Sequence, residues 1–154
     1  MASSENLKIA LLGLGRAGKF HIQSIQSIPG ISLRCVVDVD ESLAKRLAKE
    51  LECNYATDVN GPLGQEDVDA VIVASPTHEH YGQILAALEA GKAVFTEKPL
   101  GSSLEEIDSC FGLANNEEQL SIHRKKTPYR FLDGYRHGNL VNSNRIDNNW
   151  FFSI

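Results

Sequence analysis

Along the first 120 residues, short apolar runs alternate with segments whose apolar residues recur every three or four positions. Short apolar runs between turn residues are typical of buried strands, and the longer period is typical of amphipathic helices. The alternation predicts an α/β fold, a doubly wound parallel sheet with helices on both faces. The predicted strands are residues 7–12, 33–37, 54–56, 70–74 and 93–96, and the predicted helices are about 17–28, 40–51, 78–90 and 104–114.

Turn and capping residues set the ends of these elements. Asp40 is the predicted cap of the second helix. Ser102-Ser103, with a Glu three residues after each serine, form overlapping capping boxes for the last helix. Gly61-Pro62 and Gly64 predict a loop before the fourth strand.

Three glycines follow the first predicted strand at the spacing G-x-G-x-x-G. Gly13 allows a tight turn, Gly15 lets a phosphate approach the backbone, and Gly18 lets the helix pack closely. The next strand ends at Asp38, twenty positions after Gly18. A flexible turn is the alternative, but strand, helix and acid together favour a dinucleotide site. The predicted cofactor loop comprises Gly13, Leu14, Gly15, Arg16, Ala17 and Gly18.

Asp38 bears on the choice of dinucleotide. Its carboxylate can accept hydrogen bonds from both hydroxyls of an adenosine ribose. The 2′-phosphate of NADP would meet a like charge there, and no arginine follows in Asp38-Val39-Asp40. We therefore predict NAD as the cofactor, with NADP less favoured. The alternative role for Asp38 is a cap for the helix at Glu41, a place that Asp40 fills better.

Two more segments stand at the predicted carboxyl ends of strands, where ligands of doubly wound sheets bind. The first is Ser75-Pro76-Thr77-His78, and the second is Glu97-Lys98-Pro99. Lys98 could hold a substrate hydroxyl or share its proton. Glu97 could bind the nicotinamide ribose or hold the lysine charged. The alternative for this pair is a solvated ion pair at a strand end.

The histidines predict no metal site. His78 and His80 are one residue apart, whereas helical metal ligands are spaced by three or four, and no acidic or cysteine partner completes a set. His78 is instead a candidate cofactor contact at a helix N-terminus. His21, inside the first helix, is more easily explained as a packed or hydrogen-bonded histidine than as a catalytic one.

Composition narrows the function class. The net charge of −5 gives no reason to expect nucleic acid as a partner, and no apolar run is long enough to cross a membrane. Three dispersed cysteines argue against disulfides and suit a reducing compartment, so we expect a cytoplasmic protein. Residues 1–120 carry 9 Lys and Arg against 18 Asp and Glu, while residues 121–154 carry 6 against 2. Beyond a candidate strand at 119–122, this basic, Asn-rich tail has no regular period.

Several of these segments together resemble the Gfo/Idh/MocA oxidoreductases, and among them the inositol 2-dehydrogenases. The resemblance covers about residues 6–120 in order. It implies a Rossmann-type domain that binds NAD(P), with Lys98 contacting substrate and nicotinamide and a cis bond to Pro99. The segments that carry it are Lys8–Gly18 with His21, Val36–Asp38, Asp69–His78 and Val94–Leu100.

The resemblance stops near residue 120. Family members are well over twice as long and carry a second domain that binds a polyol or sugar substrate. Nothing in residues 121–154 matches that domain, so we expect it to be absent and the chain to be a truncated or alternatively spliced product, or the result of a misread reading frame. We predict two parts, a 6–120 cofactor domain and a 121–154 tail.

Three hypotheses follow for this chain. The first is an NAD-binding domain that binds cofactor with little or no turnover by itself. The second is a non-catalytic NAD-sensing module whose basic tail docks on an acidic partner. The third is an unstable fragment that self-associates through exposed apolar surface.

Overall fold

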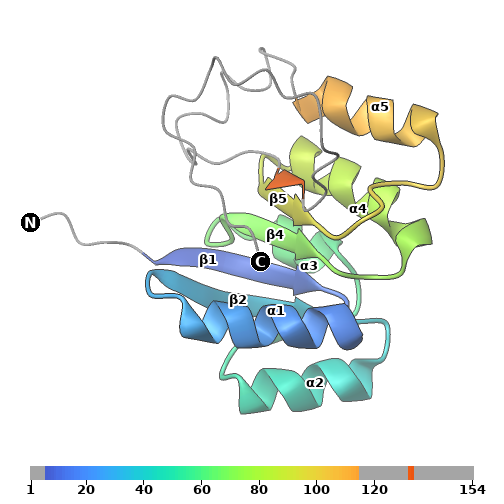
Figure 1. Cartoon of the computed structure of the whole chain (residues 1–154). Coiled ribbons are helices and arrows are strands. Elements are labelled where there is room, and N and C mark those ends of the chain that lie inside the picture. The colour runs from blue at the N-terminus through green and yellow to red at the C-terminus, as the bar shows by residue number, and fades with distance from the viewer. Residues whose placement is uncertain (1–5, 115–131, 134–154) are drawn as a thin grey trace, which may run out of the picture.

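The computed structural model describes residues 6–114 and 132–133. Its strands form one sheet in the order β3-β2-β1-β4-β5-β6, and each neighbouring pair is parallel (Figure 1). The strands are β1 (Leu7–Leu12), β2 (Ile31–Val37), β3 (Asn54–Ala56), β4 (Ala70–Val73), β5 (Ala93–Thr96) and β6 (Leu132–Asp133). The sheet is of the doubly wound Rossmann type, as predicted.

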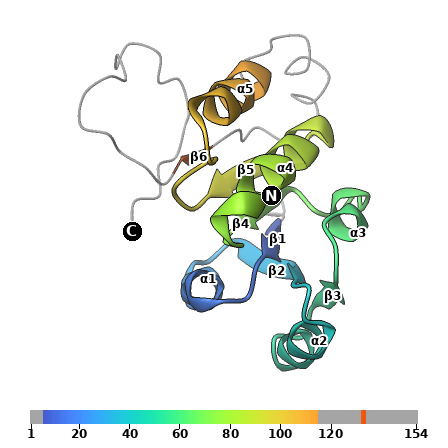
Figure 2. The same cartoon turned by 90° about the vertical axis from the view of Figure 1, so that its right-hand side faces the viewer.

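Helices cover both faces of the sheet (Figure 2). Two helices pack on one face, and the others lie over the opposite face with α5 against α4. None of the helices in the described part is long and apolar enough to cross a membrane. The helices are α1 (Arg16–Ser27), α2 (Glu41–Glu50), α3 (Asn60–Leu63), α4 (Thr77–Glu89) and α5 (Leu104–Ala114).

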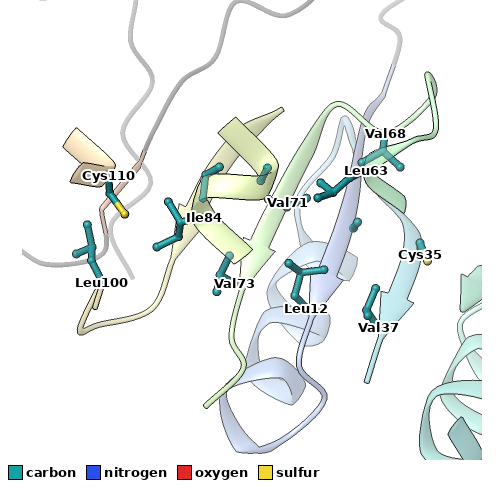
Figure 3. Packing of buried hydrophobic residues seen from close by; sticks show 13 residues of the cluster. Leu12, Cys35, Val37, Leu63, Val68, Val71, Val73, Ile84, Leu100 and Cys110 are labelled. Carbon is teal, nitrogen blue, oxygen red and sulfur yellow. The ribbon is translucent and has the colours of Figure 1, made fainter. Parts of the chain in front are cut away.

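The core is split into two layers by the sheet itself. Alternate residues of a strand point to opposite faces, so Ile9 and Leu11 of β1 pack with α1 and α2. Ala10 and Leu12 pack on the other face with α4, where Ile84 is fully buried (Figure 3). Strands buried on both faces explain why the sequence shows continuous apolar runs instead of alternation.

The chain order of the strands determines where the sheet has its topological switch point. From β1 the chain moves outward to β2 and β3, then returns to place β4 on the other side of β1. The connections after β1 and β4 therefore diverge at the carboxyl ends of these strands. In doubly wound sheets this switch point is where ligands bind.

The structure confirms the predicted strands within two residues but corrects one loop. Residues 60–63 form the short helix α3, although Gly61-Pro62 led us to predict a loop. The Asp58 side chain accepts hydrogen bonds from the N–H groups of Asn60 at 2.8 Å and Gly61 at 3.4 Å. Proline is tolerated in a first helical turn, where no intrahelical N–H donor is needed. The candidate strand at 119–122 lies outside the described residues.

Gly82, in the middle of α4, allows a direct test of this helix. It is exposed, and a Cβ built there would meet no described atom within 4 Å. Gly82→Ala is therefore expected to raise the free energy of unfolding by about 0.5–1 kcal/mol, since alanine loses less backbone entropy in a helix. Urea unfolding followed by circular dichroism measures this change. A lower stability would show that the site has no room for a methyl group.

Candidate functional site

The loop between β1 and α1 begins at a glycine enclosed by neighbouring strand ends. The N–H of Gly13 donates to the Val37 carbonyl at 2.8 Å. Its φ of +94° lies in the left-handed region, and a Cβ there would lie 2.5 Å from the backbone nitrogen of Ser75. Only glycine fits such a position. Gly13 thus holds the loop between the carboxyl ends of β2 and β4.

The other two glycines differ in their surroundings. A Cβ on Gly18 would lie 2.1 Å from the carbonyl oxygen of Gly13, so α1 packs directly on the loop backbone. Gly15 is exposed, and apart from its chain neighbours no described atom lies within 4 Å of a Cβ built there. Gly18 is therefore required by packing. Gly15 leaves open space where the sequence predicts phosphates.

The first turn of α1 faces this site without a side-chain cap. Gly15 is the N-cap residue, and no side chain among the described residues accepts from the helix start. The N–H groups of Arg16 and Ala17 have no partner within the helix because they lie in its first turn. Such a helix end carries partial positive charge and favours an anion. Leu14, in contrast, is fully buried and offers only its backbone.

Asp38 ties the end of β2 to the glycine loop. One carboxylate oxygen, Oδ2, accepts from the Leu14 N–H at 2.9 Å, and Oδ1 accepts from the Asp40 N–H at 3.0 Å. The cap of α2 is Asp40, whose side chain accepts from the Leu43 N–H at 3.0 Å. Asp40 thus fills the capping role, as predicted. Each carboxylate oxygen of Asp38 keeps acceptor capacity for a hydroxyl group.

The segment after β4 lies against the loop. Ser75 is the residue that a Cβ on Gly13 would strike, and Pro76 precedes α4, which begins at Thr77. His78 is exposed, and its Nε2 lies 3.2 Å from the carboxylate of Glu79. Ser75 therefore stands beside the glycine loop, Pro76 leads into α4, and His78 stands on the exposed first turn of α4.

The segment after β5 presents an unattached lysine. The Glu97 N–H donates to the Val73 carbonyl at 2.9 Å, and its Oε1 lies 2.8 Å from Nε2 of His21. Lys98 is exposed, and its ammonium group has no hydrogen bond or ion pair with the described residues. The Lys98–Pro99 bond is cis, as the resemblance implied. The Glu97 carboxylate pairs with His21, so the expected alternative of a Glu97–Lys98 ion pair is not found.

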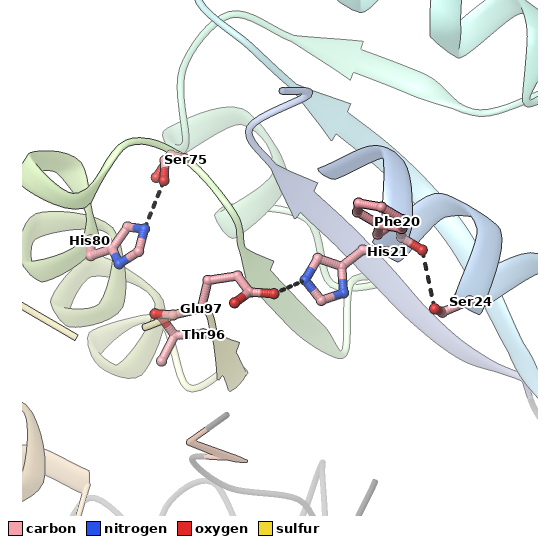
Figure 4. Close-up of polar contacts among 7 residues, drawn as sticks. All are labelled: Phe20, His21, Ser24, Ser75, His80, Thr96 and Glu97. Atoms are coloured by element: carbon pink, nitrogen blue, oxygen red, sulfur yellow. Dashed lines mark hydrogen bonds and ion pairs between the residues drawn. The ribbon is translucent and has the colours of Figure 1, made fainter. Parts of the chain in front are cut away.

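Two buried histidines hold the segments of this site together, and the role of one of them, His80, was not predicted from the sequence. His21 contacts Glu97 and packs its ring edgewise on Phe95, with centroids 5.5 Å apart, so the prediction of a hydrogen-bonded histidine is confirmed. His80 is 2% exposed and lies 2.7 Å from the Ser75 carbonyl (Figure 4). Its helical spacing to Ile84 was the available signal, because residues four apart share a face.

These contacts join all four predicted segments. Asp38 binds the glycine loop, the loop abuts Ser75, His80 connects the Ser75 segment to Pro99, and His21 binds Glu97. Together they form one continuous rim along the carboxyl ends of β2, β1, β4 and β5.

The cysteines do not contribute chemistry to this rim. Burial raises the pKa of all three thiols, to about 11 for Cys35 and Cys110, so all are protonated at neutral pH. Protonated thiols are poor nucleophiles and poor metal ligands. Among residues 6–114 and 132–133, no three His, Cys, Asp or Glu side chains are grouped as a metal site requires.

Comparison with known proteins places this site in a family. A family model described as "Oxidoreductase family, NAD-binding Rossmann fold" matches residues 7–123, which is most of the chain. The chain belongs to the Gfo/Idh/MocA oxidoreductase family. The matched segment is the family's NAD-binding domain, in agreement with the cofactor predicted from the glycine loop and Asp38.

Curated relatives in the Gfo/Idh/MocA family include inositol dehydrogenases. The chain is 41% identical over 102 residues to the scyllo-inositol 2-dehydrogenase (NAD(+)) of Bacillus subtilis, covering 65% of this chain and 30% of that protein. It is 42% identical over 107 residues to the inositol 2-dehydrogenase of Acidothermus cellulolyticus, covering 67% of this chain and 31% of that protein. The chain thus spans about a third of the length of these relatives.

Solved structures agree with the sequence comparison. The scyllo-inositol dehydrogenase of Lactobacillus casei, solved with bound NAD(H) and scyllo-inositol, is 32% identical, with a TM-score of 0.69 over 84% of this chain and 36% of that one. GenD2 from gentamicin A biosynthesis, solved in complex with NAD, is 27% identical, with a TM-score of 0.73 over 84% of this chain and 34% of that one. The matched fold is therefore found in proteins solved with NAD.

Proposed function

We propose that this chain is the NAD-binding part of an enzyme that transfers a hydride between NAD and a secondary alcohol. The alcohol belongs to a cyclic polyol of the inositol type. The names of the relatives support the substrate class, since they act on scyllo-inositol and other inositols. The family supports the cofactor. The observation that carries the proposal is the continuous rim. Within the described part of the chain, it has open space at Gly15 and, at Lys98, an ammonium group without a partner.

In this proposal the cofactor lies along the rim. The pyrophosphate occupies the open space at Gly15 and meets the N–H groups at the start of α1, while Asp38 accepts from the adenosine ribose. The nicotinamide half lies toward the segments after β4 and β5. The residues assigned to cofactor contact are Gly13, Leu14, Gly15, Arg16, Ala17, Gly18, Asp38, Ser75, Pro76, Thr77, His78, Glu97 and Lys98.

Lys98 is the residue proposed to act on the substrate. The nicotinamide supplies the hydride chemistry, and the protein positions and polarises the reacting groups. An exposed ammonium group with no partner among the described residues can donate a hydrogen bond to the reacting oxygen. That bond strengthens as negative charge develops on the oxygen, so it favours the transition state over the ground state.

We further propose that the chain alone binds NAD with little or no turnover. The family resemblance implies that substrate ligands and the proton acceptor come from a second domain. This chain spans only about a third of the length of its relatives. A missing general base costs about 10²–10⁴-fold in rate in typical enzymes. An exposed nicotinamide also lacks the exclusion of water that strengthens electrostatic stabilisation.

A thermal-shift experiment with the purified full chain tests this proposal. A ligand that binds only the folded state stabilises it by about 2.7 kcal/mol at a hundredfold excess over its Kd. NAD is expected to raise the melting temperature, and NADP at equal concentration to raise it less. Absence of any shift at millimolar NAD would contradict cofactor binding. Steady NADH formation with scyllo- or myo-inositol would contradict the absence of turnover.

A further inference from the structure

Among the described residues no side chain holds the ammonium group of Lys98, but the residues on both sides of Lys98 are held by contacts. The N–H of Glu97 donates to the Val73 carbonyl at 2.9 Å, and its carboxylate makes a hydrogen bond with the ring of His21. The carbonyl oxygen of Pro99 lies 2.6 Å from Nδ1 of His80. Both histidines are buried, at 5% and 2% exposure, and come from different helices, α1 and α4. Side chains from helices on both faces of the sheet therefore hold the segment that carries Lys98.

The contacts of His80 restrict its protonation state, because both of its ring nitrogens face carbonyl oxygens. Nδ1 lies 2.6 Å from the Pro99 oxygen, and Nε2 lies 2.7 Å from the Ser75 oxygen. A carbonyl oxygen accepts hydrogen bonds and cannot donate them, whereas a neutral imidazole donates from only one nitrogen. Only a ring with a proton on each nitrogen satisfies both carbonyls.

The charged groups around His80 do not offer it a competing partner. On its own helix, His78 and Glu79 are exposed and contact each other at 3.2 Å. On the segment after β5, the Glu97 carboxylate contacts His21, and Lys98 is exposed. The two carbonyl groups are thus the partners that the described residues give to His80.

We propose that His80 and His21 are positioning residues for Lys98, and that His80 does so as a doubly protonated ring that clamps the carbonyls of Ser75 and Pro99. The clamp fixes the distance between the segments after β4 and β5. His21 holds Glu97, the residue before Lys98, in place. The role assigned to Lys98 rests on the proposed function. The clamp itself rests only on the contacts of the two histidines.

The protonation of His80 is tested on the full chain without any ligand. NMR of the chain labelled with ¹⁵N-histidine at pH 7 is expected to show two ring N–H groups for one buried histidine, protected from exchange with water. Loss of this signal in His80→Gln assigns it. A single ring N–H, or two that exchange as fast as those of an exposed histidine, would overturn the clamp.

The positioning role is tested by following the backbone amides of Gly15 and Lys98 during NAD titration. In the wild-type chain both are expected to shift. In His80→Gln and His21→Leu the Gly15 shift is expected to remain and the Lys98 shift to be lost. Each substitution removes a contact that holds the segment of Lys98 and leaves the glycine loop unchanged. His21→Gln, which keeps a donor for Glu97, is expected to restore the Lys98 shift.

Ile84→Val is the matched control. It lies one turn beyond His80 on the same buried face and lowers stability without touching either carbonyl. It is expected to keep both amide shifts. A wild-type Lys98 shift that survives in His80→Gln would overturn positioning by His80. If NAD shifts neither amide in the wild type, the proposed function fails, and the clamp is then decided by the ring N–H groups of His80.

Discussion

Gly18→Ala is expected to lower the free energy of unfolding by about 3 kcal/mol or more. The added methyl group would lie 2.1 Å from the carbonyl oxygen of Gly13 and 3.0 Å from its carbon. The obstacle is backbone, held in turn by its hydrogen bond to Val37, so no side-chain rotation relieves it. For a domain of this size the melting temperature falls by about 10 °C. Thermal unfolding without ligand measures this loss.

Gly15→Ala is the matched control, because it makes the same chemical change three residues earlier. A Cβ there meets no described atom within 4 Å beyond its chain neighbours, so stability is expected to change by less than about 1 kcal/mol. NAD affinity is nevertheless expected to fall by at least about tenfold, about 1.4 kcal/mol, since the methyl group fills the phosphate space. Equal destabilisation by both variants would contradict this division of roles.

Strands and long helices could be predicted from the sequence because each carries its own pattern, a continuous apolar run or a helical period, over several residues. Continuous apolar runs marked strands such as Ala93–Thr96 to the residue. The capping residue Asp40 was identified from its position before an amphipathic pattern. In both cases local chemistry and the fold favour the same structure, which is why the prediction is confirmed.

The short elements α3 and β6 could not be predicted in this way. The helix α3 spans only four residues, too few for a period, and glycine and proline within it pointed to a loop. Its stabilising feature is the Asp58 side chain, which accepts from the Asn60 and Gly61 N–H groups and did not enter the prediction. The two-residue strand β6 is defined by its pairing with β5, which no local pattern encodes.

The site was predicted as four segments, but not the contacts that join them. Asp38 was assigned to a ribose, whereas the structure shows that it also binds the Leu14 N–H. His80 was considered only as a metal ligand, although it links the carbonyls of Ser75 and Pro99. These contacts join residues from different strand ends. Their geometry depends on the sheet order, so one-dimensional spacing does not reveal them.

Asp38 holds the Leu14 N–H and is also the proposed ribose ligand, so its substitution is expected to have a large effect on NAD affinity. Asp38→Asn keeps the size of the side chain but removes its charge and one of the two acceptor oxygens that now hold the Leu14 and Asp40 N–H groups. A hydrogen bond to a charged group contributes about 1.5–3 kcal/mol. The Kd for NAD is therefore expected to rise by about 10- to 150-fold. Titration calorimetry with NAD and with NADP measures both affinities.

The same substitution should narrow the preference for NAD, because the charge that repels a 2′-phosphate is gone. Asp40→Ala separates this effect from damage to the strand end. It removes the cap on the Leu43 N–H and is expected to cost about 1 kcal/mol of stability while leaving the Kd for NAD unchanged. If Asp40→Ala weakened NAD binding and Asp38→Asn did not, the carboxylate that recognises the ribose would be Asp40, and the sequence assignment of Asp38 would be wrong.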